Sequence, residues 1–447
     1  MSPKVENKGV QVEQKSGVLT SRERVRRAIH HKEPDRIPLD LGSTLVTGIK
    51  ASIYAQLKNK LGIKSGNIKV YDPFQMLAEV EDEVKKVLRV DTYGIQLPVT
   101  IFGYRNEDWK TFQMIDGTEV LISGRFEYDM LENGDLVQYP KGDRSAPPSG
   151  KMPKDGFYFD TIVRQEPIEE SRLDPKEWVE QTYDLYTEED LKYLEKTAQW
   201  YFENTDYALL GNFWGAGFGD IAIVPGPHIK YPKGIRDPEE WFLSLIIRKQ
   251  YIKEIFQYQL ELQMKNLKMY KEAVGDKIEM IVMSGTDFGA QNGPFISPDI
   301  YREVFKPLHK EMNDWVHKNT NWKTFLHSCG SDVAFLDDFI SAGVDILNPV
   351  QISAAGMDPV FLKNSYGDKL VFWGGGVDTQ NTLPFGTPED VKKEVENNMT
   401  IFGKDGGFVF NTVHNIQATV PIDNLIAMFE TVREKGSYSD LNKHYHR

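Results

Sequence analysis

The sequence contains a single cysteine, Cys329, among 447 residues. One thiol excludes an intrachain disulfide, and the N-terminal residues do not resemble a signal peptide. No apolar run approaches the ~18–20 residues that a membrane-spanning helix requires. We therefore expect a cytoplasmic protein without a membrane segment.

Blocks of basic residues are missing as well. The chain has 66 acidic and 53 basic side chains, which gives a formal net charge of −13. Such a chain repels a phosphate backbone on average, and no Lys/Arg cluster resembles a nucleic-acid-binding arm. We expect no nucleic-acid partner.

Apolar runs of strand length recur along the chain and alternate with amphipathic helical stretches. Eight such runs are present, at residues 36–41, 91–97, 207–213, 279–286, 323–328, 344–350, 370–376 and 406–412. Near-continuous apolar strands that alternate with helices predict a parallel sheet covered by helices. Eight units predict a closed (β/α)8 TIM barrel. An open doubly wound sheet is the alternative, but the Gly-rich nucleotide loop typical of that fold is absent.

Two regions lie outside this alternation. Residues 1–20 are polar and without periodicity, so we predict a disordered tail, followed by a barrel over residues 21–447 with Ser21 capping its first helix. Residues 105–165 contain alternating runs separated by "DGT" and "ENGD", which predicts a small antiparallel β insert after the second strand. The insert either shapes the pocket or is a surface hairpin.

Polar residues collect where the predicted strands end, and barrels carry their function at that face. These residues are Asp40, Asn212, Trp214, Asp287, His327, Cys329, Asn348, Gln351, Gly375, Asp378, Asn411 and His414. Few of them make good core side chains, so we expect them to ring one mouth.

A metal site is the most specific prediction from this set. His327 and Cys329 are two residues apart, which on an extended strand end points both side chains to one side. Zn²⁺ accepts an imidazole and a thiolate, and His414 could cross the mouth as a third ligand, with the fourth position open. We also expect Ser331 to cap a helix whose N-terminus favours the Cys329 thiolate. For a lone Cys or His, a buried structural role is the competing explanation.

Two further positions have open interpretations. Asp287 could act as an acid, a base or a metal ligand, or it could cap a helix or turn. The glycines around Gly375 follow the seventh predicted strand, where they could hold an anion or simply form a tight turn.

Several motifs together resemble the uroporphyrinogen decarboxylase superfamily. They are "RERVRRAIHHKEPDRIPLDL", "ISPDIYREVFKPLHK", "FLHSCG", "GVDILNPVQ", "FWGGGVDTQ" and "GGFVFNTVHNIQATVPIDNLIAMFE". The likeness covers residues 20–435 apart from the insert and is closer to the branch of cobalamin-dependent methyltransferases, which move a methyl group from a methylated corrinoid protein to coenzyme M. The resemblance implies a (β/α)8 barrel.

The methyltransferase resemblance also implies a zinc site made by a His-x-Cys pair and a later Cys. His327 and Cys329 match the pair, whereas His414 stands where that later Cys is expected. One thiolate and two imidazoles leave about +1 on Zn²⁺, which makes a stronger Lewis acid and a less nucleophilic bound thiolate. The hypothesis that follows is a methyl donor or acceptor other than coenzyme M, such as an oxygen or nitrogen methyl compound.

The decarboxylase branch, a carboxy-lyase, is the alternative, and it often has a His at the position of His414. True uroporphyrinogen decarboxylases have an arginine-rich segment after the first strand to grip the substrate carboxylates. Here that segment is "RIPLDLGSTLVTGIKAS", with Asp40 and only Arg36. A non-catalytic barrel that binds a small molecule or a corrinoid protein is a third possibility.

The leading hypothesis is therefore a zinc-dependent methyltransferase. A separate corrinoid protein would supply cobalamin, because the chain has no "DxHxxG" motif. In this scheme His327, Cys329 and His414 hold the metal. Asp287 and Asp378 contact substrate or handle protons, and the other strand-end residues bind a small methyl donor or acceptor. A homodimer is the oligomeric state common for such barrels.

Overall fold

The structure, a computed structural model, describes residues 18–445. Of the expected disordered tail, residues 1–17 lie outside the described residues. Helix α1 (Ser21–Ile29) begins directly after Thr20, whose side chain accepts a hydrogen bond from the Glu23 backbone N–H. Thr20, and not the predicted Ser21, is the N-cap, because the Glu23 side chain completes a capping box with it.

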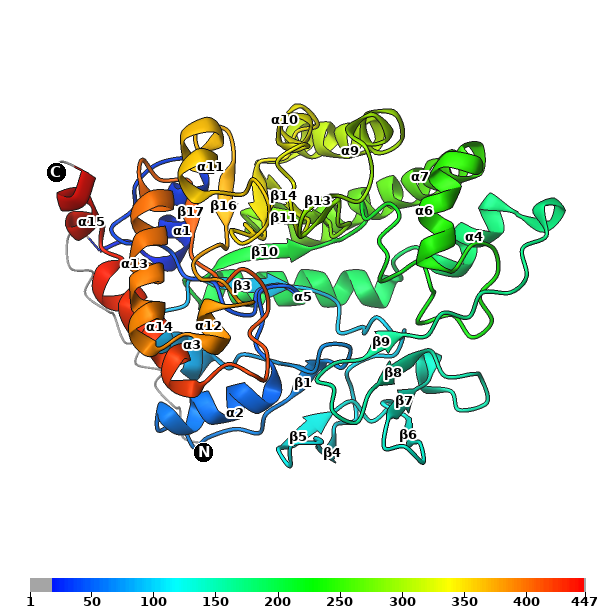
Figure 1. The fold of residues 1–447 in the computed structure, drawn as a ribbon, viewed down its shortest axis with the longest axis horizontal. Helices are drawn as coiled ribbons and strands as arrows, with labels where there is room; N and C mark the ends of the chain where they lie inside the picture. The colour runs from blue at the N-terminus through cyan, green and yellow to red at the C-terminus, as the bar shows by residue number, and fades with distance from the viewer. Residues whose placement is uncertain (1–17, 446–447) are drawn as a thin grey trace, which may run out of the picture.

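A curled parallel sheet forms the centre of the molecule (Figure 1). Its order is β17-β16-β15-β14-β11-β10-β3, so each strand pairs with the next one along the chain. The strands are β3 (Thr92–Ile95), β10 (Ala208–Asn212), β11 (Met280–Ser284), β14 (Lys323–His327), β15 (Ile346–Asn348), β16 (Val371–Trp373) and β17 (Phe408–Val409). These are seven of the eight predicted strands, and the α/β fold fits a TIM-like barrel.

The prediction that residues 36–41 form the first strand is wrong. These residues form only two isolated bridges, an antiparallel one between Arg36 and Ser437 and a parallel one between Leu39 and Phe410. Pro38 has no N–H, and the Leu39 N–H donates to the Asp91 carboxylate at 2.9 Å instead of to a backbone carbonyl. The segment still connects both edges of the sheet, because Phe410 N donates to Pro38 O and Asp91 N donates to Leu39 O, each at 2.8 Å.

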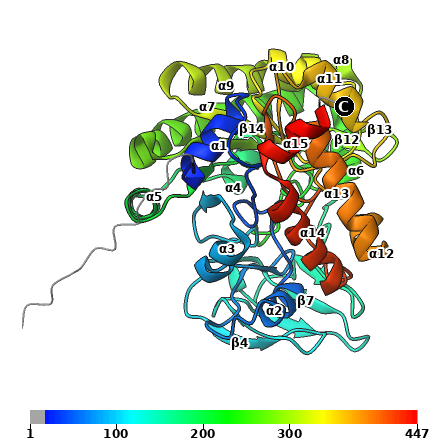
Figure 2. The same ribbon diagram turned by 90° about the vertical axis from the view of Figure 1, so that its left-hand side faces the viewer.

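Helices cover the outside of the sheet, and Figures 1 and 2 show α13 and α14 packed side by side there. The remaining helices of the described residues are α2 (Ala51–Lys60), α3 (Asp82–Leu88), α4 (Pro175–Thr182), α5 (Glu188–Asn204), α6 (Pro238–Ile247), α7 (Lys249–Val274), α8 (Pro298–Ile300), α9 (Lys306–Asn319), α10 (Leu336–Ser341), α11 (Pro359–Tyr366), α12 (Thr382–Phe385), α13 (Pro388–Gly403), α14 (Ile422–Lys435) and α15 (Tyr438–Tyr445). A π-helix (Tyr301–Phe305) joins α8 to α9, and short 3₁₀ turns occur at Pro140–Gly142, Glu170–Arg172 and Gly275–Lys277. Among residues 18–445, no helix combines the length and the apolar character needed to cross a bilayer.

Within residues 18–445, ten short strands pair outside the central sheet. Between β3 and α4, strands β4 (Lys110–Gln113) and β5 (Glu119–Ile122) form one antiparallel pair, and β6 (Tyr128–Met130), β7 (Leu136–Gln138), β8 (Gly150–Met152) and β9 (Asp160–Thr161) form an antiparallel sheet. The other pairs are β1 (Val70–Asp72) with β2 (Leu77–Ala78) and β12 (Gly289–Ala290) with β13 (Gly293–Pro294). Figure 1 shows β4–β9 together on one side of the central sheet.

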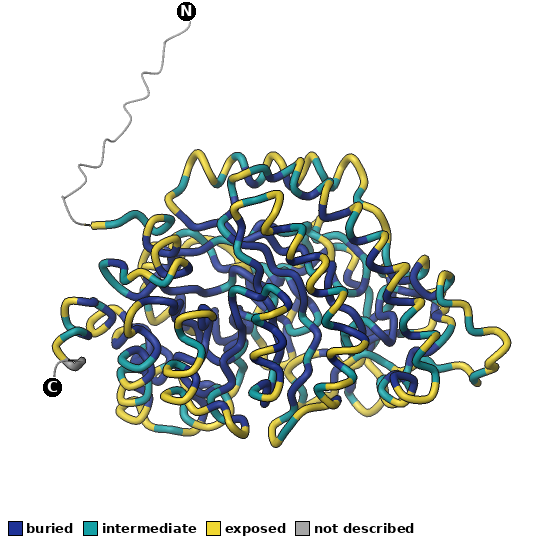
Figure 3. The backbone as a smooth tube through the Cα atoms, turned by 90° about the horizontal axis from the view of Figure 1, so that it is seen from above, coloured by how far each residue is buried: buried dark blue, intermediate teal, exposed yellow. Residues whose placement is uncertain are grey.

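Helix α1 closes the end of the sheet at which the strands begin. Its Arg22 N–H donates to Asp206 O, and Ala28 O accepts from Gly407 N, just before β10 and β17 respectively. Val25, Ala28 and Ile29 pack with inward side chains of the strands in one buried cluster. Figure 3 shows this buried interior surrounded by an exposed periphery. The opposite end, where the strands finish, is the face at which folds of this kind carry their sites.

Candidate metal centre

Three side chains from two distant segments meet where the strands end. His327 is the last residue of β14, Cys329 follows two positions later, and His414 lies beyond β17. One ligand atom from each lies within 4.8 Å of the other two. Cys329 Sγ is 3.3 Å from His327 Nε2, and the two imidazole centroids are 5.5 Å apart. The structure therefore brings together the three side chains that were predicted as metal ligands.

The orientation of His327 is fixed by a neighbouring strand. Its Nδ1 donates to Asn348 Oδ1 at 2.6 Å, and Asn348 Nδ2 donates to Trp373 O at 2.8 Å. Because the second bond holds the amide, its oxygen faces the imidazole and places the proton on Nδ1. His327 Nε2, the atom nearest to the sulfur, keeps its lone pair for a metal. Asn348 thus positions a ligand, whereas the sequence suggested that it contacts substrate.

Cys329 lies in a turn held from both sides. Its backbone N–H donates to Asp287 Oδ1 at 2.7 Å, and the next N–H, of Gly330, donates to Gln351 Oε1 at 2.8 Å. The prediction that Ser331 caps a helix at this point is wrong. Helix α10 begins only at Leu336, and Ser331 Oγ donates to Ala355 O at 2.6 Å. Cys329 therefore has no helix N-terminus to stabilise its thiolate.

Carboxylates dominate the electrostatics around the sulfur. Burial first, and then Asp287, Asp332 and Asp220, raise the pKa of the Cys329 thiol well above its usual value. Desolvation also raises the pKa of Asp287, and it raises that of Asp220 to about 7. These carboxyl groups in a desolvated site disfavour the negatively charged thiolate form of Cys329. A bound divalent cation would instead favour the thiolate.

Asp220 and Asp332 were not among the predicted site residues. Asp332 is fully buried, and one of its oxygens accepts from Ser328 Oγ at 2.9 Å, whereas the other has no partner among the described residues. Asp220 follows β10 by eight residues in the loop "WGAGFGD". Two features of the sequence could have indicated these residues: the acidic residue that ends the "WGAGFGD" loop, and the position of Asp332 three residues after Cys329.

The donor set fits zinc. One thiolate and two imidazole nitrogens are ligands that Zn²⁺ accepts in a three-ligand site with one open position. His327 is 4% exposed, whereas Cys329 and His414 are only partly buried, so the cluster reaches the surface of the mouth on one side. Asp287 Oδ1, at 3.9 Å from His327 Nε2, is the nearest carboxylate.

Three of the other predicted site residues make hydrogen bonds within the protein. Asp40 is 1% exposed, and its carboxylate accepts bonds from Thr92 Oγ1 at 2.6 Å and Trp373 Nε1 at 2.9 Å. Asn411 is equally enclosed and donates from Nδ2 to Asp40 O at 3.0 Å. Gln351 connects Gly330 to the neighbouring loop. These side chains support the mouth from within.

The two residues after β16 also have local roles. Asp378 accepts from Gln380 N at 2.9 Å and from Asn381 Nδ2 at 2.7 Å, so both of its oxygens serve a turn. Gly375 has φ +75°, and a Cβ there would lie 2.8 Å from Val350 Cβ. A tight turn therefore accounts for the glycine.

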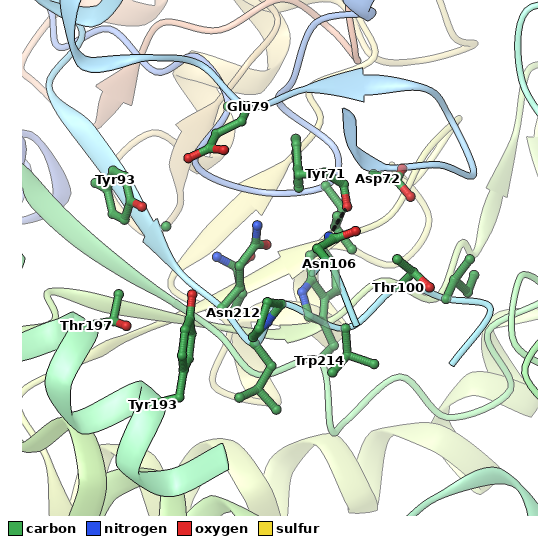
Figure 4. Close-up of a pocket in the computed structure, with 18 of the residues that line it drawn as sticks. Tyr71, Asp72, Glu79, Tyr93, Thr100, Asn106, Tyr193, Thr197, Asn212 and Trp214 are labelled. Carbon is green, nitrogen blue, oxygen red and sulfur yellow. Dashed lines mark hydrogen bonds between the residues drawn. The ribbon is translucent and has the colours of Figure 1, made fainter. Parts of the chain in front are cut away.

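Asn212 and Trp214 line a cavity of about 410 Å³, whose lining includes none of the three candidate ligands (Figure 4). A Cβ at Gly285 would lie 2.9 Å from the Trp214 ring and 3.5 Å from Asp220 Oδ2, so Trp214 and Asp220 approach the same point. Asn106 and Trp109, near the start of the β4–β5 segment, also face the cavity. The cavity therefore extends from the mouth towards that segment.

Comparisons with known proteins agree with part of the resemblance. No curated protein matches the sequence. A solved methyltransferase from Methanosarcina mazei is similar at 14% identity, covering 93% of this chain and 98% of that one, with a TM-score of 0.46. A likeness at that level carries no conclusion about this chain. The Uroporphyrinogen decarboxylase (URO-D) family model matches residues 235–435, which include β11 to β17 and all three candidate ligands. Residues 235–435 thus have the sequence pattern of the uroporphyrinogen decarboxylase family, and this confirms the superfamily resemblance that the motifs indicated.

Proposed function

We propose that the protein is a zinc-dependent methyltransferase that exchanges a methyl group between a small organic molecule and the cobalamin of a separate corrinoid protein. The observation that carries the proposal is the convergence of His327 Nε2, Cys329 Sγ and His414 at the open end of the sheet. When bound there, Zn²⁺ supplies a Lewis acid that polarises the atom bearing or accepting the methyl group.

The residues of the chain have distinct parts in this scheme. His327, Cys329 and His414 hold the metal, and Asn348 keeps His327 Nε2 directed towards it. Asp287 accepts the Cys329 N–H and fixes the turn that presents the sulfur. The adjacent cavity receives the small molecule, with Trp214 at the end near Asp220.

A carboxy-lyase of the uroporphyrinogen decarboxylase type is the second candidate, and the family match over residues 235–435 favours it. The cavity argues against a porphyrinogen substrate. Lys85 is the one cationic side chain among the residues that line it. Eight substrate carboxylates require clustered positive charge to offset their desolvation, and one ammonium does not provide it.

Methyl transfer measured with and without metal tests the proposal. Zinc-loaded protein is incubated with methylcobalamin or cob(I)alamin and a panel of methyl acceptors or donors, while the cobalamin absorbance is followed. We expect turnover that stops on chelation, and loss of both zinc and turnover in Cys329→Ser. His317→Ala is the matched control, because His317 pairs with Asp345 at 2.7 Å outside the cluster.

Two outcomes contradict the proposal. Full methyl transfer by chelated, metal-free protein would remove the role of the cluster. Release of carbon dioxide from uroporphyrinogen, unaffected by chelation, would favour the carboxy-lyase instead.

A further inference from the structure

A buried lysine without a partner lines the cavity. Lys85, on α3, is 2% exposed and lines the same cavity as Asn212 and Trp214. Among residues 18–445, its Nζ has no hydrogen bond and no ion pair. It makes cation–π contacts with two rings, at 4.1 Å from the Tyr93 centroid and 5.6 Å from the Tyr207 centroid. Burying an ammonium without an anion is unfavourable, so a lysine in this setting points to an anionic ligand.

A second unsatisfied polar group faces the same space. Asn212 is 7% exposed, and its Nδ2 donates to Ser43 O at 2.9 Å. That bond fixes the amide, and the buried Oδ1 has no partner in the described part of the chain. Figure 4 shows Asn212 in the cavity between Tyr93 on one side and Trp214 on the other. A free carbonyl oxygen in such a position calls for a ligand O–H or N–H donor.

The aromatic residues of the lining suit the flat, apolar ring of a ligand. Aromatic rings face the cavity from several elements, and the volume lies in the range of small-molecule sites. They are Tyr71, Tyr93, Trp109, Tyr186, Tyr193, Phe213, Trp214 and Tyr270.

Two carboxyl groups also line the cavity, and neither pairs with Lys85. Glu79 is half exposed and lies 3.9 Å from Lys69 Nζ, whereas Asp72 accepts the backbone N–H groups of Phe74 and Gln75. Asp82, Asp40 and Glu79 raise the pKa of Lys85 from farther away, but burial outweighs them, and none forms a direct ion pair with its ammonium.

We propose that this cavity binds a small aromatic molecule that has a carboxylate for Lys85 and a hydroxyl or N–H donor for Asn212. Calling that molecule the methyl-transfer substrate rests on the proposed function, whereas the binding itself does not. Tyr93 and Trp214 lie on different sides of the cavity. The carboxylate is therefore held at the Lys85 side, and the opposite side of the ring lies towards Trp214, the neighbour of Asp220.

Calorimetric titration with three matched probes tests the assignment. 4-Hydroxybenzoate, 4-hydroxybenzamide and 4-hydroxybenzylamine share the ring and the hydroxyl and differ in charge. We expect the acid to bind at least tenfold more tightly than the amide and the amine, in metal-free and zinc-loaded protein alike. Benzoate, which lacks the donor for Asn212, should bind more weakly than 4-hydroxybenzoate.

Variants of neighbouring lysines separate a binding role from a structural one. Lys85→Met should weaken binding of the acid at least tenfold and leave the melting temperature of the free protein unchanged or higher, because an unpaired buried charge is removed. Lys86→Met, at the exposed neighbour, should bind the acid as the wild type does. Equal binding of the acid by a folded Lys85→Met variant, or tighter binding of the amine by the wild type, overturns the proposal.

A measurement on the wild type alone covers the case in which Lys85→Met fails to fold. Burial lowers the pKa of Lys85 to about 8, and a bound carboxylate raises it again. Titration of the acid near pH 8 in two buffers of different ionisation enthalpy should therefore show proton uptake. Absence of uptake refutes the pairing. Because no methyl transfer is measured, failure here leaves the metal centre standing, and failure of methyl transfer leaves this binding standing.

Discussion

Asn348 offers a sharp test of how the metal centre is built. It is fully buried and lies between His327 Nδ1, at 2.6 Å, and Trp373 O, at 2.8 Å. In Asn348→Ala both partners lose their bond, and the imidazole loses the group that fixes its ring orientation and tautomer. Removal of such a supporting partner typically lowers metal affinity about 10–100-fold, which is about 1.4–2.7 kcal/mol.

Zinc affinity is measured by competition with a chromophoric chelator, and stability by thermal unfolding in excess chelator. Asn424→Ala is the matched control, since Asn424 is 2% exposed and donates to Leu383 O at 2.9 Å and Gly386 O at 2.8 Å, away from the cluster. Both variants should lose stability, by about 1–3 kcal/mol for a buried group left unpaired, but only Asn348→Ala should lose zinc affinity. Zinc affinity within twofold of the wild type in Asn348→Ala would show that Asn348 does not position a ligand.

Three further predictions follow from the same geometry. Asp378→Asn should lower the free energy of unfolding by about 0.5–1.5 kcal/mol through the lost turn bonds and leave zinc affinity unchanged; a loss of zinc would contradict the turn role. Gly375→Ala should destabilise by about 1–3 kcal/mol in denaturant titration, because its φ is positive and Val350 blocks the new Cβ, and unchanged stability would contradict this. Burial lowers the pKa of His309 to about 4, so the unfolded state binds a proton there first and stability must fall as the pH drops from about 6.5 to about 4. His309→Gln should reduce the slope of unfolding free energy against pH in that window by up to one proton, and an unchanged slope would refute the assignment.

The strands of the barrel were predictable because they are apolar on both faces. The exceptions arise where a side chain replaces the backbone as a hydrogen-bond partner. Asp91 accepts the Leu39 N–H, so the first predicted strand is reduced to isolated bridges. Likewise, Asp72 accepts the Phe74 and Gln75 N–H groups, so the residues after β1 form a turn and α3 begins only at Asp82.

The candidate ligands were predictable for a different reason. Spacing on a strand end fixes the relation of His327 to Cys329, and the order of strands around the sheet brings His414 to the same mouth. Asp220 was not predictable, because it lies eight residues beyond the end of β10 and no local pattern fixes the direction of that loop. The role of Lys85 could not be predicted from the sequence either, because it depends on which side chains surround its ammonium in the folded protein.

X-ray absorption at the zinc edge of the purified protein tests the central claim most directly. We expect about one zinc per chain, bound by one sulfur and two imidazole nitrogens at distances near 2.3 and 2.0–2.1 Å, with a lighter fourth ligand. In His414→Ala the imidazole contribution should fall to one nitrogen. Protein purified without zinc that does not acquire it, or a spectrum free of sulfur, would contradict the metal centre described here.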